Sequence, residues 1–355
     1  MTGGLVVDAR VERDGFSLDV RLRAAPGEVL AVLGPNGAGK STLLGAIAGL
    51  TSVTSGRIVL DGHVLDDADA GVFVETAHRP VGLVFQDYRL FPYLTVLDNV
   101  AFAARARGAG RARSRAQAQV WIDRLGLTEL AARRPRDLSG GQAQRTALAR
   151  ALAAAPAALL LDEPLAALDA RTRLDVQAEL KRHLAQFAGP SLVVTHDPVD
   201  ALVLADRLVV LEDGQVVQDA APADVARRPA TGYVAKLVGL NLYRGAADGD
   251  EVRLDGGGTL TVPDHGERGA VLVSIRPSAV VVSTHRPGTT SARNVWPATV
   301  VGLTMLTDRV RLDLAGHPSA LVDVTPAAVA ELGIAPGDGL WLSVKATEIE
   351  VYPQP

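Results

Sequence analysis

The stretch GPNGAGKST, residues 34–42, follows the apolar run VLAVL at 29–33 and leads into the helical pattern STLLGAIAGL at 41–50. It matches the pattern GxxxxGK[ST], in which glycines let the backbone curl so that successive N–H groups converge on phosphate oxygens. In such a loop Lys40 reaches the β- and γ-phosphates and Ser41 ligates magnesium. The alternative is a glycine-rich turn that only starts a helix. The residues predicted to bind phosphate are Gly34, Pro35, Asn36, Gly37, Ala38, Gly39, Lys40, Ser41 and Thr42.

Other short apolar runs indicate that the strand before this loop belongs to an α/β domain with a mainly parallel sheet. Segments with helical periodicity separate the runs, and we expect the last two runs to close the sheet. The runs are VGLVF at 81–85, ALLLD at 158–162, SLVVT at 191–195 and RLVVL at 207–211. The Ala- and Arg-rich segment in between predicts an inserted helical subdomain at about residues 87–155.

Polar side chains follow three of these runs. Asp162 and Glu163 end the run at 158–162, where Asp162 would hold magnesium and Glu163 would polarise the attacking water. Gln86 and His196 also follow apolar runs, so both are expected near the γ-phosphate at the carboxyl edge of the sheet. Taken singly, each also fits a solvated or structural group. The predicted catalytic residues are Glu163, His196 and Gln86, and the predicted metal ligands are Ser41, Gln86 and Asp162.

The stretch LSGGQ at 138–142 raises the question of a second anion site. Ser139 and Gln142 fit a capping box, which would make this only a well-started helix. However, two adjacent glycines inside a helix are unfavourable by about 1 kcal/mol each relative to alanine, and they are useful where something approaches the backbone closely. Because the chain already has a complete phosphate loop, we expect the second site to serve a nucleotide that a second copy of the chain holds.

Taken together, GPNGAGKST, VFQD, LSGGQ, LLLDEP, AALD and VVTHD occur in an order that resembles the ATP-binding cassette family. The resemblance covers the first 230 or so residues and implies ATP with Mg²⁺, and a homodimer in which each signature sequence meets the partner's γ-phosphate. It adds Ser139, Gly140, Gly141, Gln142 and Asp169 to the nucleotide-binding residues. The family's usual SALD is AALD here, with Ala166 in place of serine, and Phe16 is a candidate to stack on adenine.

After residues 221–241 the pattern changes to short alternating segments separated by Gly, Asp and Pro, which is typical of an all-β unit. With the family resemblance, the expected fold is an α/β P-loop NTPase, with a RecA-like core and an inserted helical subdomain, followed by a small all-β OB-like barrel domain. We expect a nucleotide-binding domain at 1–228, a linker at 229–245 and a regulatory domain at 246–355. Within the last, a unit similar to TOBE or Mop domains is expected at about 289–353.

Composition narrows the class of protein. The 355 residues carry a formal net charge of -4 and contain no cysteine, which excludes disulfides and thiolate metal sites and argues against nucleic acid as a partner. The chain lacks an uninterrupted apolar stretch of the length that spans a membrane, which is about 18 residues or more. It also lacks the charge and apolar pattern of a secretory signal, so we expect a protein that is not secreted.

A lone cassette with a β tail and no membrane span favours the ATPase of an importer. The partners that the resemblance implies are an integral-membrane permease and, indirectly, a substrate-binding protein, and the expected location is the cytoplasmic face of the membrane. Tyr88, Leu90, Phe91 and Tyr93 form an apolar cluster suited to a docked permease helix, although these residues equally fit packing between lobes. A soluble cassette protein acting on nucleic acid or ribosomes is the alternative from another class.

The segment at 56–96 is similar to molybdate-importer ATPases, and SARNVWPATVV at 291–301 with LWLSVKATEIEV at 340–351 is similar to the barrel of molybdate-binding proteins. That likeness carries over Ser291, Arg293 and Lys345 as ligands for molybdate or tungstate. A hydroxyl, a guanidinium and an ammonium suit a tetrahedral dianion. The alternatives are surface groups without a ligand, and an importer of sulfate, polyamine or sugar with a structural tail.

Overall fold

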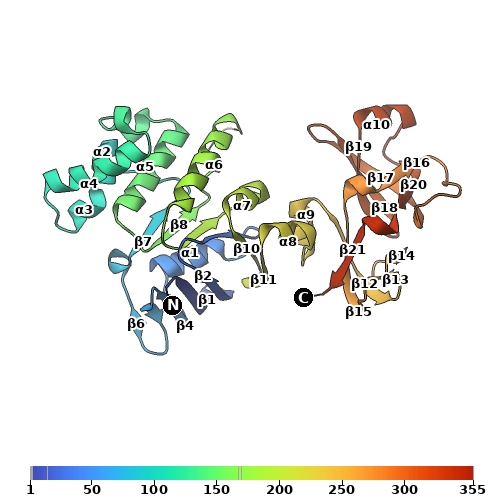
Figure 1. Cartoon of the computed structure of the whole chain (residues 1–355), viewed down its shortest axis with the longest axis horizontal. Helices are drawn as coiled ribbons and strands as arrows, with labels where there is room; N and C mark the ends of the chain where they lie inside the picture. The colour runs from blue at the N-terminus through green and yellow to red at the C-terminus, as the bar shows by residue number, and fades with distance from the viewer. Residues whose placement is uncertain (1–2, 14, 167, 169, 355) are drawn as a thin grey trace. The chain divides into compact units, whose positions relative to one another are not determined.

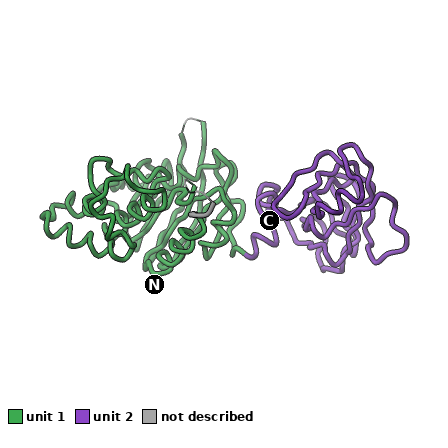
Figure 2. The backbone as a smooth tube through the Cα atoms, turned by 90° about the horizontal axis from the view of Figure 1, so that it is seen from above, with its two compact units in different colours: residues 1–222 green, residues 223–355 purple. Residues whose placement is uncertain are grey.

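The computed structural model describes residues 3–13, 15–166, 168 and 170–354. The chain divides into two compact units, Met1–Pro222 and Ala223–Pro355 (Figure 2). Each unit has its own apolar core.

The parallel part of the first sheet contains all five apolar runs that the sequence singles out. Its strands lie in the order β10 (Arg207–Glu212), β3 (Val29–Leu33), β9 (Ser191–Val194), β8 (Ala158–Asp162) and β7 (Val81–Val84). Continuous runs of Val, Leu and Ala suit these strands because both faces of a parallel sheet are covered. All five residues of β3 and all four of β9 are buried accordingly.

The expectation that the last two runs close the sheet is wrong, because β9 and β10 flank β3 inside it and the edges are β6 and β7. The sheet also continues into an antiparallel part that the sequence reading did not identify. Alternation in β1, where Leu5, Val7, Ala9 and Val11 are buried, marks that part as a sheet with one face on the core. Its strands are β1 (Leu5–Arg13), β2 (Phe16–Ala24), β4 (Ser55–Leu60), β5 (His63–Asp67) and β6 (Val72–Phe73). Strand β11 (Gln215–Ala220) joins the two parts, because it pairs antiparallel with β10 and parallel with β2.

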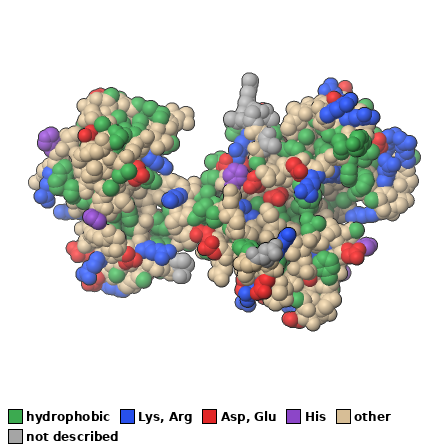
Figure 3. Space-filling view, turned by 180° about the vertical axis from the view of Figure 1, so that it is seen from behind, with side chains coloured by type: hydrophobic (Ala, Val, Ile, Leu, Met, Phe, Trp, Pro, Cys, Tyr) green, Lys and Arg blue, Asp and Glu red, His purple; other side chains and the backbone are tan. Residues whose placement is uncertain are grey.

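The inserted segment is helical, as its composition indicates. It holds α2 (Val96–Val100), α3 (Phe102–Ala106), α4 (Arg111–Arg124) and α5 (Gly140–Ala153), which pack together at one end of the unit (Figure 1). Arginines gather on the outside of this helical lobe (Figure 3), where Arg107, Arg111, Arg113 and Arg124 are exposed. Elsewhere in this unit, α1 (Lys40–Ala48) follows the phosphate loop, and α6 (Ala170–Ala185) and α7 (Pro198–Leu204) follow β8 and β9.

The second unit is all-β, as expected, apart from three short α-helices and two single turns of 3-10 helix among its described residues. One five-stranded sheet has the order β14 (Thr259–Thr261), β13 (Glu251–Leu254), β12 (Asn241–Asp248), β15 (Gly269–Ile275) and β21 (Ile349–Pro353). The other has the order β16 (Val281–Ser283), β20 (Gly339–Val344), β17 (Asn294–Met305), β18 (Val310–Gly316) and β19 (Ala320–Val324). The helices are α8 (Pro222–Arg227), α9 (Gly232–Val238) and α10 (Pro326–Leu332).

Both sheets of this unit contribute to one apolar core, which contains Val252 and Val273 from one sheet and Leu312 and Leu342 from the other. The segment at 229–245, expected as a linker, holds α9 and the first residues of β12. In the part of the chain that the structure describes, no helix is both long and apolar enough to cross a bilayer.

Candidate functional site

The phosphate loop follows the buried strand β3, and its glycines take conformations that other residues avoid. Gly39, at the start of α1, has φ +100°, and a Cβ there would lie 2.8 Å from Leu18 Cδ1 and 2.9 Å from Phe16 Cζ. At Gly34 a Cβ would run into the carbonyl oxygen of Leu211. The loop is therefore shaped by the neighbouring strands as well as by its own backbone.

Lys40 is the first residue of α1 and is 8% exposed. Its Nζ donates to the carbonyl oxygens of Gly34, at 2.7 Å, and Pro35, at 2.9 Å. Burial lowers the pKa of Lys40, while the nearby carboxylates of Glu163 and Asp162 act in the opposite direction. The ammonium thus lies over the curl of the loop, where an anion would take over the role of the two carbonyls.

A cleft of about 480 Å³ opens beside Lys40 and brings together most of the predicted site. Gly34, Pro35 and Ala38 belong to the same loop but do not line this cleft. Arg13 and Val194 also line it, and neither was predicted: Arg13 lies outside every recognised motif, and Val194 belongs to VVTHD but was assigned only to the apolar run. The predicted residues that line the cleft are Phe16, Asn36, Gly37, Gly39, Lys40, Ser41, Thr42, Gln86, Asp162 and Glu163.

Glu163 follows β8 and holds the centre of a hydrogen-bonded group. Gln86 Nε2 donates to Glu163 Oε2 at 3.0 Å, and His196 Nδ1 lies 3.0 Å from Glu163 Oε1. The residue itself has φ +45°, a left-handed conformation that is unfavourable for a side chain other than glycine and is typical of functional positions. Two of the predicted catalytic residues, Gln86 and His196, therefore both contact the carboxylate of the third, Glu163.

Asp162, the neighbouring carboxyl group, has different surroundings. Burial raises its pKa, Glu163 raises it further, and Lys40 opposes both effects. Asp162, Ser41 and Gln86 line the same cleft and offer carboxylate, hydroxyl and amide oxygens, the hard ligands that Mg²⁺ prefers. The residues predicted as metal ligands therefore fit a magnesium ion that phosphate oxygens would help to hold.

The signature residues lie on another part of the unit. Ser139 caps α5 through a capping box, in which its Oγ accepts from the Gln142 N–H and Gln142 Oε1 accepts from the Ser139 N–H at 3.0 Å. Ser139 and Gly140 are exposed, Gly141 is buried, and none of them is among the described residues that line the cleft of Lys40. Ala166 is exposed, and Asp169 lies outside the described residues.

Of the apolar residues after Gln86 that were predicted to suit a permease helix, some pack inside the helical lobe and others lie on its surface. Tyr88 is 7% exposed and Leu90 packs against the core of the lobe, whereas Tyr93 is 87% exposed. Phe91 lies against Phe102, with ring centroids 4.3 Å apart. The helical lobe also carries a groove of about 690 Å³, which sequence reasoning missed. Among the residues that line it are Arg107, Arg113, Trp121, Leu152 and Phe187.

In the second unit, Ser291 and Lys345 line one pocket of about 450 Å³ with Arg276, Ser278 and Glu348. Arg293, predicted from the likeness, is exposed and is not among the described residues that line this pocket. Arg276 and Ser278 lack a recognised motif, and only the fold brings them to Lys345.

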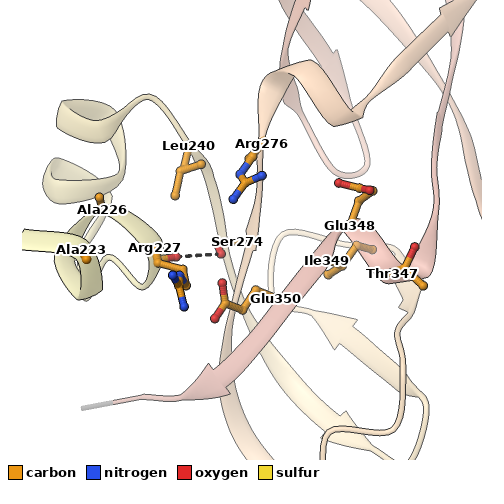
Figure 4. A pocket seen from close by; sticks show the side chains of 10 residues that line it. All are labelled: Ala223, Ala226, Arg227, Leu240, Ser274, Arg276, Thr347, Glu348, Ile349 and Glu350. Carbon is orange, nitrogen blue, oxygen red and sulfur yellow. Dashed lines mark hydrogen bonds between the residues drawn. The ribbon is translucent and has the colours of Figure 1, made fainter.

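Arg276 also lines a second pocket, of about 480 Å³, in which Arg227 and Glu350 face one another across its base (Figure 4). At its floor, Ser274 Oγ lies 3.4 Å from the carbonyl oxygen of Arg227, and the carboxylate of Glu350 pairs with Arg228 at 2.7 Å. Acidic and basic groups are balanced here, in contrast to the pocket of Lys345, where two cations face one carboxylate.

Two family models match the chain. Residues 18–166 match the ABC transporter family, and residues 290–351 match the TOBE domain. The first match contains the phosphate loop, Gln86, the signature and both acids, and the second contains Ser291 and Lys345.

Full-length relatives share both parts. The chain is 41% identical over 350 residues to the molybdenum import ATP-binding protein ModC of Mycobacterium tuberculosis, covering 95% of each chain. It is 36% identical over 346 residues to the sulfate/thiosulfate import ATP-binding protein CysA 2 of Chromobacterium violaceum, covering 96% of this chain and 91% of the other.

Among solved structures, the ATP-binding cassette MJ0796, seen as a dimer in a post-hydrolysis state bound to ADP and Pi, aligns with a TM-score of 0.52. The two share 32% identity, over 62% of this chain and 98% of the other. These likenesses extend over the strands, the phosphate loop and the acids described above. The chain therefore belongs to the ATP-binding proteins of ABC importers, and it is an ATP-binding enzyme that hydrolyses ATP.

Proposed function

We propose that this chain is the ATPase subunit of an importer for molybdate or tungstate, and that its second unit binds the transported oxyanion. The observation that carries the substrate class is the pocket in which Ser291 and Lys345 lie with Arg276 and Ser278. Two cations, Arg276 and Lys345, line the pocket with four hydroxyl-bearing residues and one carboxylate, that of Glu348. The excess of positive charge and the hydroxyl groups suit a tetrahedral dianion. The likeness to ModC over 95% of both chains supports the same choice.

In the proposed reaction Glu163 is the general base. Its carboxylate is oriented from both sides, by Gln86 at one oxygen and His196 at the other, so it can accept a proton from a water molecule aligned with the γ-phosphate. Lys40 would leave the two loop carbonyls to contact the phosphates, and the loop N–H groups would hold the phosphate oxygens. Bound Mg²⁺ would supply charge neutralisation, held by Ser41, Asp162 and Gln86.

A second copy of the chain would complete the site. Ser139 and Gly140 are exposed at the start of a helix of 14 residues, where N–H groups and the helix dipole favour an anion. Because these residues are absent from the cleft of Lys40, their phosphate would belong to the partner. Gly141, Gln142 and Asp169 would take part in the same contact.

The groove of the helical lobe is the proposed seat for the permease. Trp121, Leu152 and Phe187 provide an apolar lining, and Arg107 and Arg113 lie at the same groove. A helix with an apolar face and acidic flanks would suit it. Docking there would hold the protein at the cytoplasmic face of the membrane, where it would act with a substrate-binding protein on the other side.

The substrate is tested by calorimetric titration of the full-length protein with molybdate, tungstate and sulfate. Binding of molybdate and tungstate but not sulfate, lost in Lys345→Ala and kept in Lys236→Ala, is the expected result. Lys236 is a suitable control because it is exposed on α9 and is not among the residues that line the pocket. Comparison of Arg276→Ala with Arg293→Ala then tells which arginine contacts the anion.

Selective binding of sulfate would instead favour the second candidate, a sulfate importer, which the likeness to CysA 2 supports. If none of the three anions binds, the oxyanion site is wrong and the second unit has another role, while the ATPase assignment stands.

A further inference from the structure

Arg150, in the last turn of α5, reaches from the signature helix to the loop after Gln86. Its Nη1 donates to the carbonyl oxygen of Arg89 at 2.6 Å, and its Nη2 donates to the carbonyl oxygen of Tyr88 at 2.7 Å. A single guanidinium therefore holds two successive peptide groups that lie more than 60 residues away in the sequence.

The two residues that it holds have an unusual backbone. Tyr88 has φ +58° and Arg89 has φ +42°, although neither is glycine. Side chains with a Cβ avoid this left-handed region unless the surroundings fix the backbone there. Gln86, which donates to Glu163, comes two residues before the first of them. The reach of Gln86 into the cleft therefore depends on a turn that is not favoured by its own sequence.

The surroundings of Arg150 make the two carbonyls its main partners. Burial lowers the pKa of its guanidinium, and no carboxylate pairs with it among the residues that the structure describes. Its guanidinium carbon lies 5.6 Å from the centroid of the Phe91 ring, a second favourable contact for a cation. A half-buried cation with no counter-charge needs these hydrogen bonds, so the helix end and the turn are tied to each other.

We propose that Arg150 is a positioning residue for Gln86, and that it links the position of the signature helix to the hydrogen bond between Gln86 and Glu163. The proposal rests on the catalytic role assigned above to Gln86 and Glu163. Helix α5 begins next to Ser139 and runs for 14 residues, about 20 Å at 1.5 Å per residue. Because a helix moves as a rigid element, a contact made at its first turn would shift Arg150 and, through Tyr88 and Arg89, the Gln86 side chain.

The test compares Arg150→Met, Arg150→Lys and Arg145→Met. Arg145 is the matched control because it is half-buried on the same helix and donates to the carbonyl of Leu125, away from the turn. We expect Arg150→Met to lower kcat by about 10- to 100-fold with KM for ATP nearly unchanged, the effect of a catalytic group that is bound but misplaced. Arg150→Lys, which keeps the charge and can hold one carbonyl, should fall in between.

The deciding readout is a double-mutant cycle with Gln86→Ala. If Arg150 acts through Gln86, Arg150→Met will lower kcat in the parent but will cause little further loss of kcat in Gln86→Ala. If Arg150→Met does not fold, Arg150→Lys takes its place in the cycle. An equal fold-loss in both backgrounds would overturn the proposal, as would a loss in Arg145→Met as large as in Arg150→Met. A Gln86→Ala variant with parental kcat would instead refute the role of Gln86 itself.

Discussion

Asp162 and Glu163 are adjacent in sequence, yet their surroundings differ, in keeping with the different roles proposed for them. Glu163 is held by Gln86 and His196, whereas burial and the neighbouring carboxylate raise the pKa of Asp162. A partly buried carboxylate beside a second carboxylate makes the protein less stable until a cation binds. The Asp162 carboxylate, which is proposed to hold Mg²⁺, therefore lowers the stability of the protein when no cation is bound.

The prediction is that Asp162→Asn stabilises the nucleotide-free protein at neutral pH while ATP hydrolysis is lost. Since the pKa of Asp162 is raised in the folded state, the folded state binds this proton more tightly than the unfolded state does. The folded protein therefore becomes less stable as the pH rises and the Asp162 carboxyl group ionises. The melting temperature of Asp162→Asn should therefore exceed that of the parent at pH 7.5, and the gap should narrow towards pH 4. A lower melting temperature at pH 7.5 would contradict this reading.

Gly39 offers a second test at one residue. A Cβ at Gly39 would meet Phe16 and Leu18 in addition to the positive φ, whereas Gly37 has φ +84° with open space around its Cβ position. Gly39→Ala should therefore destabilise the protein by more than the roughly 1 kcal/mol expected for backbone strain alone. Chemical denaturation of Gly39→Ala beside Gly37→Ala measures the difference, and equal losses would show that the contact with Phe16 is unimportant.

Residues within motifs were predictable because their chemistry needs a fixed spacing. The phosphate loop, the two acids and Gln86 each follow an apolar run, and the fold brings them into one cleft with Phe16. Arg13, Arg150 and Arg276 could not be found in this way. The fold places each of them beside residues that are distant in the sequence, and a single arginine in an arginine-rich sequence gives no local signal.

At the scale of elements, buried parallel strands gave the clearest sequence signal. The runs that become β3, β7, β8, β9 and β10 are continuous and apolar, so their existence was predictable while their order in the sheet was not. Strands β1 and β2 alternate between buried apolar residues and exposed charged residues, so neither forms a continuous apolar run in the sequence. The exposed residues include Asp8, Arg10, Asp19 and Arg21. The short helix α9 lies within the segment predicted as a linker, and its seven residues give too little periodicity to predict a helix.

The capping box of α5 supports a prediction about an element. Ser139→Ala removes the side-chain acceptor for the Gln142 N–H, which should reduce stability by about 1 kcal/mol, and it should also lower ATP hydrolysis because Ser139 is proposed to contact the partner's nucleotide. Thr325→Ala is the control, since the Thr325 side chain caps α10 in the second unit by accepting from the Ala328 N–H. We expect Ser139→Ala and Thr325→Ala to lose similar amounts of stability, and only Ser139→Ala to lose ATPase activity. Unchanged activity in Ser139→Ala would leave the serine as a cap alone.

At the scale of the whole molecule, the two groups of residues proposed to bind ATP lie on separate parts of one chain. The cleft of Lys40 and Glu163 lacks the signature residues among its described lining, and the signature residues at the start of α5 are exposed. Two copies, each offering its signature to the other, would complete both sites with the same pair of surfaces, as a two-fold symmetric contact requires.

The most direct test of this account is sedimentation velocity of Glu163→Gln with and without ATP and Mg²⁺. This variant keeps the phosphate loop and a side chain that can accept from Gln86, but it lacks the carboxylate that is proposed to accept the proton, so ATP should bind without turnover. The account predicts a monomer without nucleotide and a stable dimer with ATP, with hydrolysis reduced to background. A variant that stays monomeric at saturating ATP, or that hydrolyses ATP at the parental rate, would contradict it.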